Sequence, residues 1–458
     1  MRCAAGEART CSGLQLQPGR SELGGGVKEK LSASAKGRRD KGRRSPGTLV
    51  LIALCAYHVR MTTTDSTRSK AQLDHERWLL DLTSLPTAAG REDRVIAWIE
   101  DWVDRRGKHL KLKRDKVGNL LITQTRKETR KRADQKRPKP IYITAHLDHP
   151  AFVVRKMIDE TTVELEFRGG VHDAYFENAR IEIIDRADES HLGVIESLDT
   201  KAKPFKRITA RLTRPAELQK GDIGRWLFED HQHLPHVDQD NILHTHACDD
   251  LAAVAAALAA LDLARKRKGL EHVGILFTLA EEVGFVGAIG ACKHKSVPKS
   301  SRLICLENSR SFTESPIGAG PILRVGDRIS VFEPNLTNAI SAILLEHQKK
   351  HADYRWQRKL MPGGACEATA FSSFGYESTC VCLPLGNYHN MQDIDGVQNG
   401  ARPARVGPEF ISVDDYHGMI DLLVRTAKEL DGKKIKPIRD RMEDIYKKHG
   451  RVLKNAST

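Results

Sequence analysis

The feature that most constrains this fold is a set of apolar segments that each end in a histidine or a carboxylate. HVGILFTL is followed by the adjacent carboxylates Glu281 and Glu282, and IYITA is followed by His146 and Asp148. Burying one unpaired carboxylate is costly, and two adjacent carboxylates also repel each other. We therefore expect these side chains either to reach solvent or to share a strongly positive partner.

Helix-like and strand-like segments alternate along the second half of the chain. The helical pattern recurs at 249–268, 336–351 and 413–430, and apolar strands lie between these helices at 272–279 and 301–308. Strands that alternate with helices predict an α/β fold with a mainly parallel central sheet flanked by helices. Residues 151–245 differ because they hold short alternating strands and no convincing helix, which predicts an inserted small all-β barrel.

These patterns divide the chain into five expected segments. They are a basic N-terminal extension at 1–69, a catalytic α/β domain in two parts at 70–150 and 246–447, the inserted barrel at 151–245, and a C-terminal tail at 448–458. The apolar run at 48–59 is too short to span a membrane, and no clean cleavage site follows it. We therefore interpret Met61 as the translation start and expect a cytoplasmic protein.

The net charge of +14 is concentrated in two stretches. Residues 1–60 carry a net +8 and residues 126–139 carry a net +6, so the rest of the chain is neutral. Neither stretch interleaves aromatic residues with its basic residues, so we expect no nucleic-acid partner and no membrane partner. Nine cysteines without metal-finger spacing fit a reducing compartment.

Five separate segments deliver a histidine or carboxylates to the ends of predicted strands or to the start of a helix. These residues are His146, Asp148, Asp249, Asp250, Glu281, Glu282, Glu307 and His389. Sites in open α/β sheets form outside the carboxyl ends of the strands, so we expect these side chains to meet. Alone, each histidine is most simply a hydrogen-bonded core residue, and Asp249 or Asp250 is a helix N-cap. Together they form the ligand set of a hydrolytic zinc, manganese or cobalt centre, and their number favours two metal ions that share a carboxylate.

The ordered motifs AHLDH, ACDD, AEEVGFVGA, LEN and NYHN resemble the MH clan of dinuclear zinc exopeptidases. The resemblance covers about residues 72–430 and is strongest to the glutamyl and deblocking aminopeptidases that form tetrahedral dodecamers, which have also often been labelled endoglucanases. The chain departs from the family pattern in several places. His149 and Pro150 replace a usual Glu–Ile pair, Glu307 and Glu367 stand where aspartate is common, and NYHN replaces an Arg-Tyr-x-His run.

The resemblance implies a role for each site residue and a reaction for the protein. The first metal ion would be bound by His146 and Glu307, the second by Glu282 and His389, and both by Asp249, while Asp148 would orient His146 and Glu281 would be the general base. The cofactors would be two divalent ions, zinc first, with cobalt or manganese as alternatives. The expected function is a dimetal-dependent aminopeptidase that hydrolyses N-terminal residues from short peptides.

Three alternatives remain on the same scaffold: an N-acyl-amino-acid deacylase, a carboxypeptidase, and a catalytically silent peptide-binding relative. The presence of Glu281 argues against a silent relative. The position of the insertion, before Asp249 rather than after the glutamate pair, argues against the other two.

The resemblance also implies a homo-oligomer, from a dimer up to a dodecamer, assembled through the inserted domain. A histidine-rich stretch at 231–246 is interpreted as a polar loop, with a third metal site as its alternative.

Overall fold

The structure is a computed structural model that describes residues 68–126, 138–228, 230–231, 233–432 and 438–454. Nearly all of the predicted N-terminal extension, including Met61, lies outside the described residues, as do most of the basic stretch at 126–139 and the end of the C-terminal tail. No helix in the described part of the chain combines the length and the apolar character needed to cross a bilayer.

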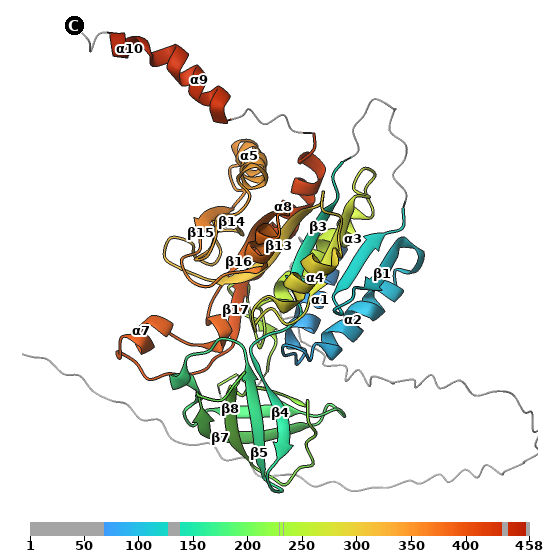
Figure 1. The fold of residues 1–458 in the computed structure, drawn as a ribbon, viewed down its shortest axis with the longest axis vertical. Coiled ribbons are helices and arrows are strands. Elements are labelled where there is room, and N and C mark those ends of the chain that lie inside the picture. The colour runs from blue at the N-terminus through green and yellow to red at the C-terminus, as the bar shows by residue number, and fades with distance from the viewer. Residues whose placement is uncertain (1–67, 127–137, 229, 232, 433–437, 455–458) are drawn as a thin grey trace, which may run out of the picture. The chain divides into compact units, whose positions relative to one another are not determined.

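The centre of the fold is an eight-stranded mixed sheet (Figure 1). In spatial order its strands are β1 (Leu110–Arg114), β2 (Leu120–Gln124), β12 (Val273–Thr278), β3 (Ile141–His146), β13 (Arg302–Arg310), β16 (Glu377–Leu385), β14 (Ile322–Gly326) and β15 (Gln357–Leu360). The four strands β12, β3, β13 and β16 run parallel, whereas β2 and β14 join them antiparallel. The α/β class is therefore confirmed, and the carboxyl ends of the four parallel strands lie at one edge.

The described residues form helices of which some cover the two faces of this sheet and others, such as the last two, lie away from it. They are α1 (Lys70–Ser84), α2 (Asp93–Asp104), α3 (Leu251–Ala264), α4 (Val286–His294), α5 (Pro334–Lys350), α6 (Glu367–Ser373), α7 (Ile394–Gln398), α8 (Val413–Glu429), α9 (Ile438–His449) and α10 (Arg451–Lys454). Three 3₁₀ turns complete the set: η1 (Gly107–His109), η2 (Asp173–Phe176) and η3 (Tyr388–Asn390).

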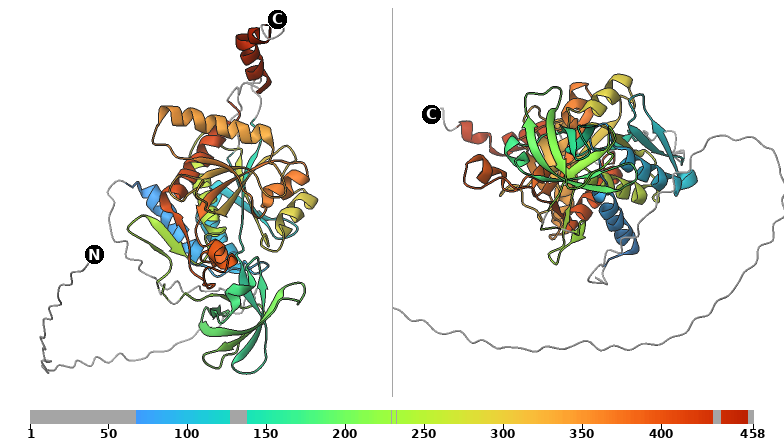
Figure 2. Two further views of the ribbon diagram at one scale, coloured as in Figure 1. Left: turned by 90° about the vertical axis from the view of Figure 1, so that its left-hand side faces the viewer. Right: turned by 90° about the horizontal axis from the view of Figure 1, so that it is seen from below.

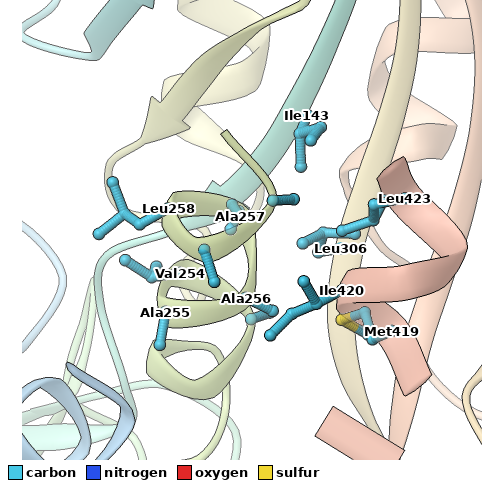
Figure 3. Close-up of a cluster of buried hydrophobic side chains, with 14 of the residues drawn as sticks. Ile143, Val254, Ala255, Ala256, Ala257, Leu258, Leu306, Met419, Ile420 and Leu423 are labelled. Atoms are coloured by element: carbon cyan, nitrogen blue, oxygen red, sulfur yellow. The ribbon is translucent and has the colours of Figure 1, made fainter. Parts of the chain in front are cut away.

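The largest core cluster lies between α3, α8 and one face of the sheet. Nearly every residue of α3 is buried, because its alanines let the helix approach both the sheet and its neighbouring helices closely. Figure 3 shows Ile143 of β3 and Leu306 of β13 beside α3 side chains and Ile420 of α8. Each fully buried Leu or Ile side chain contributes about 1.5–3 kcal/mol, so this cluster holds α3 and its N-terminal end firmly at the sheet edge. On the opposite face, α4 and α6 pack on a second cluster.

The predicted inserted β barrel is confirmed. Its six strands close in the order β4 (Ala151–Met157), β5 (Thr162–Arg168), β8 (Lys206–Leu212), β7 (Ser190–Asp199), β6 (Arg180–Ile184) and β9 (Ile223–Trp226). Its interior is filled by Phe152, Phe167, Phe176 and Trp226, whose ring centroids lie 4.8–6.0 Å apart. Figure 1 and the left view of Figure 2 show this barrel beyond one end of the strands of the main sheet.

A small three-stranded sheet follows the barrel. It pairs β10 (His236–Val237) with β11 (Ile242–Thr245), and β11 with β17 (Glu409–Ser412). Thr245 lies opposite Glu409 in this register, so the chain that leads into Asp249 runs beside the chain that leads into α8. This pairing joins two segments far apart in sequence at the candidate site.

Candidate metal centre

His146 is the last residue of β3 and is 1% exposed. Its ring Nδ1 lies 3.1 Å from the backbone carbonyl oxygen of Asp148. A neutral imidazole that donates from Nδ1 keeps a lone pair on Nε2. That Nε2 lies 3.5 Å from Asp249 Oδ1, 3.9 Å from Glu307 Oε2 and 4.0 Å from Glu281 Oε2. The imidazole therefore directs its metal-binding Nε2 toward these three carboxylate oxygens.

His389 lies in η3 and has the same arrangement. Its Nδ1 lies 2.6 Å from the carbonyl oxygen of Gly170, which directs Nε2 to the carboxylates. Nε2 lies 3.3 Å from Asp249 Oδ2 and 3.3 Å from Glu282 Oε1. His389 has a φ of 54°, a left-handed conformation that costs a non-glycine residue about 1–3 kcal/mol. The surrounding contacts hold the histidine in this unfavourable conformation.

The donor atoms form overlapping groups in which all atoms lie within 4.8 Å of one another. These groups are His146 with Asp249, Asp250 and Glu307; Asp249 with Glu282 and His389; and His146 with Glu281 and Glu282. Asp249 belongs to two of them and offers a different oxygen to each histidine. Two ligands bound tetrahedrally to zinc at 2.0–2.1 Å lie about 3.3 Å apart, which is close to these separations. The five residues predicted from the sequence as metal ligands therefore lie together in these groups.

The buried carboxylates of the site favour the binding of a cation. Burial, together with the charges of neighbouring carboxylates, raises the pKa values of Glu281, Glu307 and Asp250 well above their ordinary range. The buried oxygens Asp249 Oδ1, Glu282 Oε1 and Glu307 Oε1 form no hydrogen bond with any described residue. A divalent cation would satisfy these oxygens and remove the repulsion, so the residues present fit a metal centre.

Asp148 positions the paired glutamates as well as the first histidine. Its Oδ1 accepts a hydrogen bond from the backbone N–H of Glu281 at 2.9 Å, and its Oδ2 accepts one from that of Glu282 at 3.0 Å. Oδ1 also lies 3.5 Å from Nδ1 of His146. One fully buried carboxylate thus fixes the ends of β3 and β12 relative to each other.

Asp250 holds a different role from the N-cap considered in the sequence analysis. It occupies the N-cap position of α3, but its side chain makes no capping hydrogen bond. Instead Oδ2 accepts from the backbone N–H of His146 at 3.2 Å, and Oδ1 accepts from Nδ2 of Asn308 at 2.8 Å. The peptide bond between Asp249 and Asp250 is cis.

Glu409 supports the site and was not predicted from the sequence. It is fully buried, and its Oε2 accepts from the backbone N–H groups of Cys248 at 2.7 Å and Asp249 at 2.9 Å. Its Oε1 accepts from the backbone N–H of His389 at 2.8 Å. Burial raises its pKa to about 7. This side chain joins the segment of the shared carboxylate to that of the second histidine.

His149 also supports the site, at a position where the chain departs from the family pattern. Its Nδ1 donates to the backbone carbonyl of Asp249, and its Nε2 lies 3.0 Å from Oδ1 of Asn390. Asn390 in turn donates from Nδ2 to the carbonyls of His246 and Gly407 at 3.0 and 3.3 Å. At the position where the family usually has glutamate, His149 therefore forms a hydrogen bond to the backbone of Asp249.

The remaining candidates lie outside the ligand groups. Glu367 is 1% exposed, its oxygens form no hydrogen bond with described residues, and burial raises its pKa to about 7. His231, His236 and His244 stack their rings with centroids 5.0–6.4 Å apart. Among the described residues these three histidines do not form a group with metal-ligand spacing.

Comparison with known proteins identifies the family. The family model for M42 glutamyl aminopeptidase matches residues 127–402, which is more than half of the chain. The chain belongs to the M42 glutamyl aminopeptidase family. As an M42 member it is a metal-dependent aminopeptidase that hydrolyses peptide bonds, which confirms the predicted activity.

Solved structures show the same fold as this M42 chain. Aminopeptidase APDkam598 from the archaeon Desulfurococcus kamchatkensis is 18% identical, with a TM-score of 0.60 over 80% of this chain and 99% of that chain. The TET1 peptidase of Pyrococcus horikoshii, described as assembling into a tetrahedron or a large octahedral shell, is 17% identical, with a TM-score of 0.58 over 77% and 99%. A Thermotoga maritima protein titled endoglucanase is 17% identical, with a TM-score of 0.51 over 76% and 96%. A search of curated proteins gave no significant match.

Proposed function

We propose that the M42 site of this chain holds two divalent cations and releases N-terminal residues from short peptides. Zinc is the first choice, with cobalt or manganese as alternatives. The observation that carries the proposal is the position of Asp249, whose two oxygens lie 3.5 Å from Nε2 of His146 and 3.3 Å from Nε2 of His389. A carboxylate that faces two imidazoles with different oxygens is suited to bridge two ions.

The remaining ligands divide between the two histidines. Glu307 lies 3.9 Å from Nε2 of His146 and would complete the first position. Glu282 lies 3.3 Å from Nε2 of His389 and would complete the second. When bound, the ions would polarise the scissile carbonyl and increase the acidity of the attacking water.

Glu281 is the proposed general base. Its backbone is fixed by Asp148, and its side chain is 8% exposed, with Oε2 4.0 Å from Nε2 of His146. Burial and the neighbouring carboxylates raise its pKa, which favours its taking a proton from water. The same carboxyl group then delivers that proton to the leaving amine as the peptide C–N bond breaks.

The site counts against the other reactions considered. Glycosidases use a pair of carboxylates without a metal, whereas these carboxylates surround two imidazoles. The family match favours neither a deacylase nor a carboxypeptidase, nor a silent relative.

We also propose that this chain forms a homo-oligomer in which the inserted barrel contributes to assembly. Support comes from the TET1 peptidase of similar fold, which is described as a tetrahedron or octahedral shell. The catalytic domain is proposed to comprise residues 70–150 and 246–447, with the barrel between them. The oligomer would range from a dimer to a dodecamer, and its mass in solution is measured by light scattering.

The direct test of this function uses the full-length chain loaded with zinc and a panel of short peptides. Each peptide is supplied with a free and with an acetylated N-terminus, and mass spectrometry follows the products. The account predicts stepwise release from the free N-terminus alone, with loss of release when a chelator is added. Cleavage of the acetylated peptides at an equal rate, or release from the carboxyl end, would contradict it.

A further inference from the structure

The loop that carries the paired glutamates is held by side chains from three other segments. Four successive backbone N–H groups, those of residues 279–282, donate hydrogen bonds to these side chains. The donor–acceptor distances are 3.1 Å to Oδ1 of Asn119, 2.9 Å to Oε1 of Glu92, and 2.9 and 3.0 Å to the two oxygens of Asp148. The backbone of this loop is therefore fixed by residues that lie far from it in sequence.

Ala280 lies directly before the proposed general base and has a left-handed backbone conformation, with a φ of 52°. This conformation is strained in a residue other than glycine, so it persists only where neighbouring contacts hold it. The N–H of Ala280 donates to Glu92, and its carbonyl oxygen accepts from the N–H of Val286 at 3.2 Å. The dihedral angles of Ala280 set the direction in which the chain enters Glu281, so these two contacts determine where the base points.

Glu92 reaches the loop from the N-terminal end of α2, where it is 3% exposed. It occupies the N-cap position of this helix, but its side chain makes no capping hydrogen bond. Its Oε1 accepts instead from the backbone N–H groups of Gly90 and Ala280, both at 2.9 Å. Burial first, and then the charge of Asp148, raises the pKa of Glu92 to about 7. Burying a carboxyl group is costly, and since this one does not cap its helix, what it contributes is its pair of hydrogen bonds to loop backbone.

The segment before α2 also contacts the chain that follows the first histidine. Oγ1 of Thr87 donates to the backbone carbonyl of Leu147 at 2.7 Å, and the N–H of Leu147 donates to the carbonyl of Thr278 at 3.0 Å. Residues 87–92 are therefore hydrogen-bonded to the chain after β3 as well as to the chain after β12.

The two glutamates of the pair differ in what else holds them. Oε1 of Glu282 lies 3.3 Å from Nε2 of His389, where the proposed second ion would hold the carboxylate. Glu281 is not a proposed ligand, so the position of its carboxylate depends on the backbone of the loop. A displacement of about 1 Å at a reacting group can lower the rate about 100-fold, so the base is the more sensitive of the two.

We propose that Glu92 is a positioning residue for the general base, because it holds the N–H of Ala280 and so directs Glu281 toward the attacking water. The inference rests on the aminopeptidase function proposed above. Glu92 acts through the backbone and takes no proton in the reaction. Glu281 still accepts the proton from water and delivers it to the leaving amine.

The test compares Glu92→Ala, which removes the acceptor, with Glu92→Gln, which keeps a carbonyl oxygen at the same reach. In Glu92→Ala we expect kcat to fall roughly 10–100-fold while KM and zinc content stay at the wild-type values, because only the base is displaced. Glu92→Gln should retain a kcat close to that of the wild type. The matched control is Asp93→Ala, which should leave kcat unchanged, since Asp93 lies in the first turn of the same helix, is exposed, and pairs with Arg91.

A second measurement does not depend on activity. Amide hydrogen exchange, followed by mass spectrometry on the zinc-free protein, reports on a peptide that contains residues 279–282. This peptide should exchange faster in Glu92→Ala than in the wild type, Glu92→Gln or Asp93→Ala, because the N–H of Ala280 loses its acceptor.

The other outcomes count against the proposal. A wild-type kcat in Glu92→Ala, or unchanged amide exchange, would overturn it. An equal loss of kcat in Glu92→Gln would also overturn it, since the charge and not the hydrogen bond would then matter. Loss of zinc in Glu92→Ala would show that Glu92 holds the metal ligands and not the base. If the wild-type protein releases no N-terminal residue, the proposed function fails and this inference fails with it, whereas an active wild type limits any failure to the inference.

Discussion

Nδ1 of His389 lies 2.6 Å from the backbone carbonyl oxygen of Gly170, a residue that follows the barrel strand β5. The inserted barrel therefore does more than extend the molecule, because its backbone sets the ring orientation of a proposed metal ligand. A histidine that donates from Nδ1 binds metal through Nε2, and such supporting contacts strongly affect metal affinity. This contact couples the barrel to the chemistry of the α/β domain.

Gly169→Ala should weaken metal binding by displacing that carbonyl. Gly169 has a φ of 135°, and an added Cβ would lie 2.6 Å from Cβ of Pro150. The backbone must shift, so we expect metal affinity to fall about tenfold. Gly170→Ala is the matched control, because its Cβ would lie 3.9 Å from His389, an ordinary contact. Isothermal titration with zinc compares the two variants, and equal affinities would show that the barrel contact is unimportant.

Glu281→Gln should abolish most activity while leaving the metal content intact. The amide cannot take a proton from water, so kcat should fall by about 10²–10⁴-fold. Glu282→Gln serves as the comparison, because Glu282 lies 3.3 Å from Nε2 of His389 and should cost the protein one ion. Elemental analysis and peptide-release assays are run on both variants. Equal metal loss in the two would mean that Glu281 is a ligand and not the base.

Glu409→Gln should lower the free energy of unfolding and weaken zinc binding at the site. The carboxylate accepts three backbone hydrogen bonds, from Cys248, Asp249 and His389, and a glutamine amide must turn its NH₂ group toward at least one of these N–H groups. An unsatisfied buried donor costs about 1–3 kcal/mol, and zinc affinity should fall about 10–100-fold. Denaturant unfolding and zinc titration measure the two effects. The exposed Glu177→Gln variant is the control and should change neither.

Much of the site was predictable because most of the proposed ligands lie at the end of an apolar strand or just before a helix, although Glu307 lies within β13. His146 lies at the end of β3, Glu282 lies just after β12, and Asp249 lies just before α3. Glu409 gives no such signal, because its partners are backbone N–H groups at residues 248, 249 and 389, and pairing over such distances leaves no local pattern. The strand order of the barrel was not predictable for the same reason: it depends on which alternating strands pair.

Asp262 makes stability depend on pH. Burial alone would raise its pKa, but contacts with His75, Arg265, Lys266 and Arg106 hold that pKa well below the ordinary value. A depressed folded-state pKa gives stability that is present above the unfolded value of about 3.9 and is lost as pH falls below it. Asp262→Asn should therefore lower the free energy of unfolding by roughly 3 kcal/mol at neutral pH. Denaturant titrations of both proteins near pH 7 and pH 3 should show the gap narrowing at the lower pH, because the loss begins at the unfolded pKa and is complete only at the lower folded-state pKa. A constant gap would refute this interpretation.

The most direct test of the two-cation account is an anomalous-difference map from crystals of the zinc-loaded protein, with data collected on both sides of the zinc absorption edge. The account predicts two peaks, one between His146 and Glu307 and one between His389 and Glu282, with Asp249 contacting both. A single peak, or peaks that leave Asp249 without a metal contact, would contradict the shared-carboxylate centre on which the proposed mechanism depends.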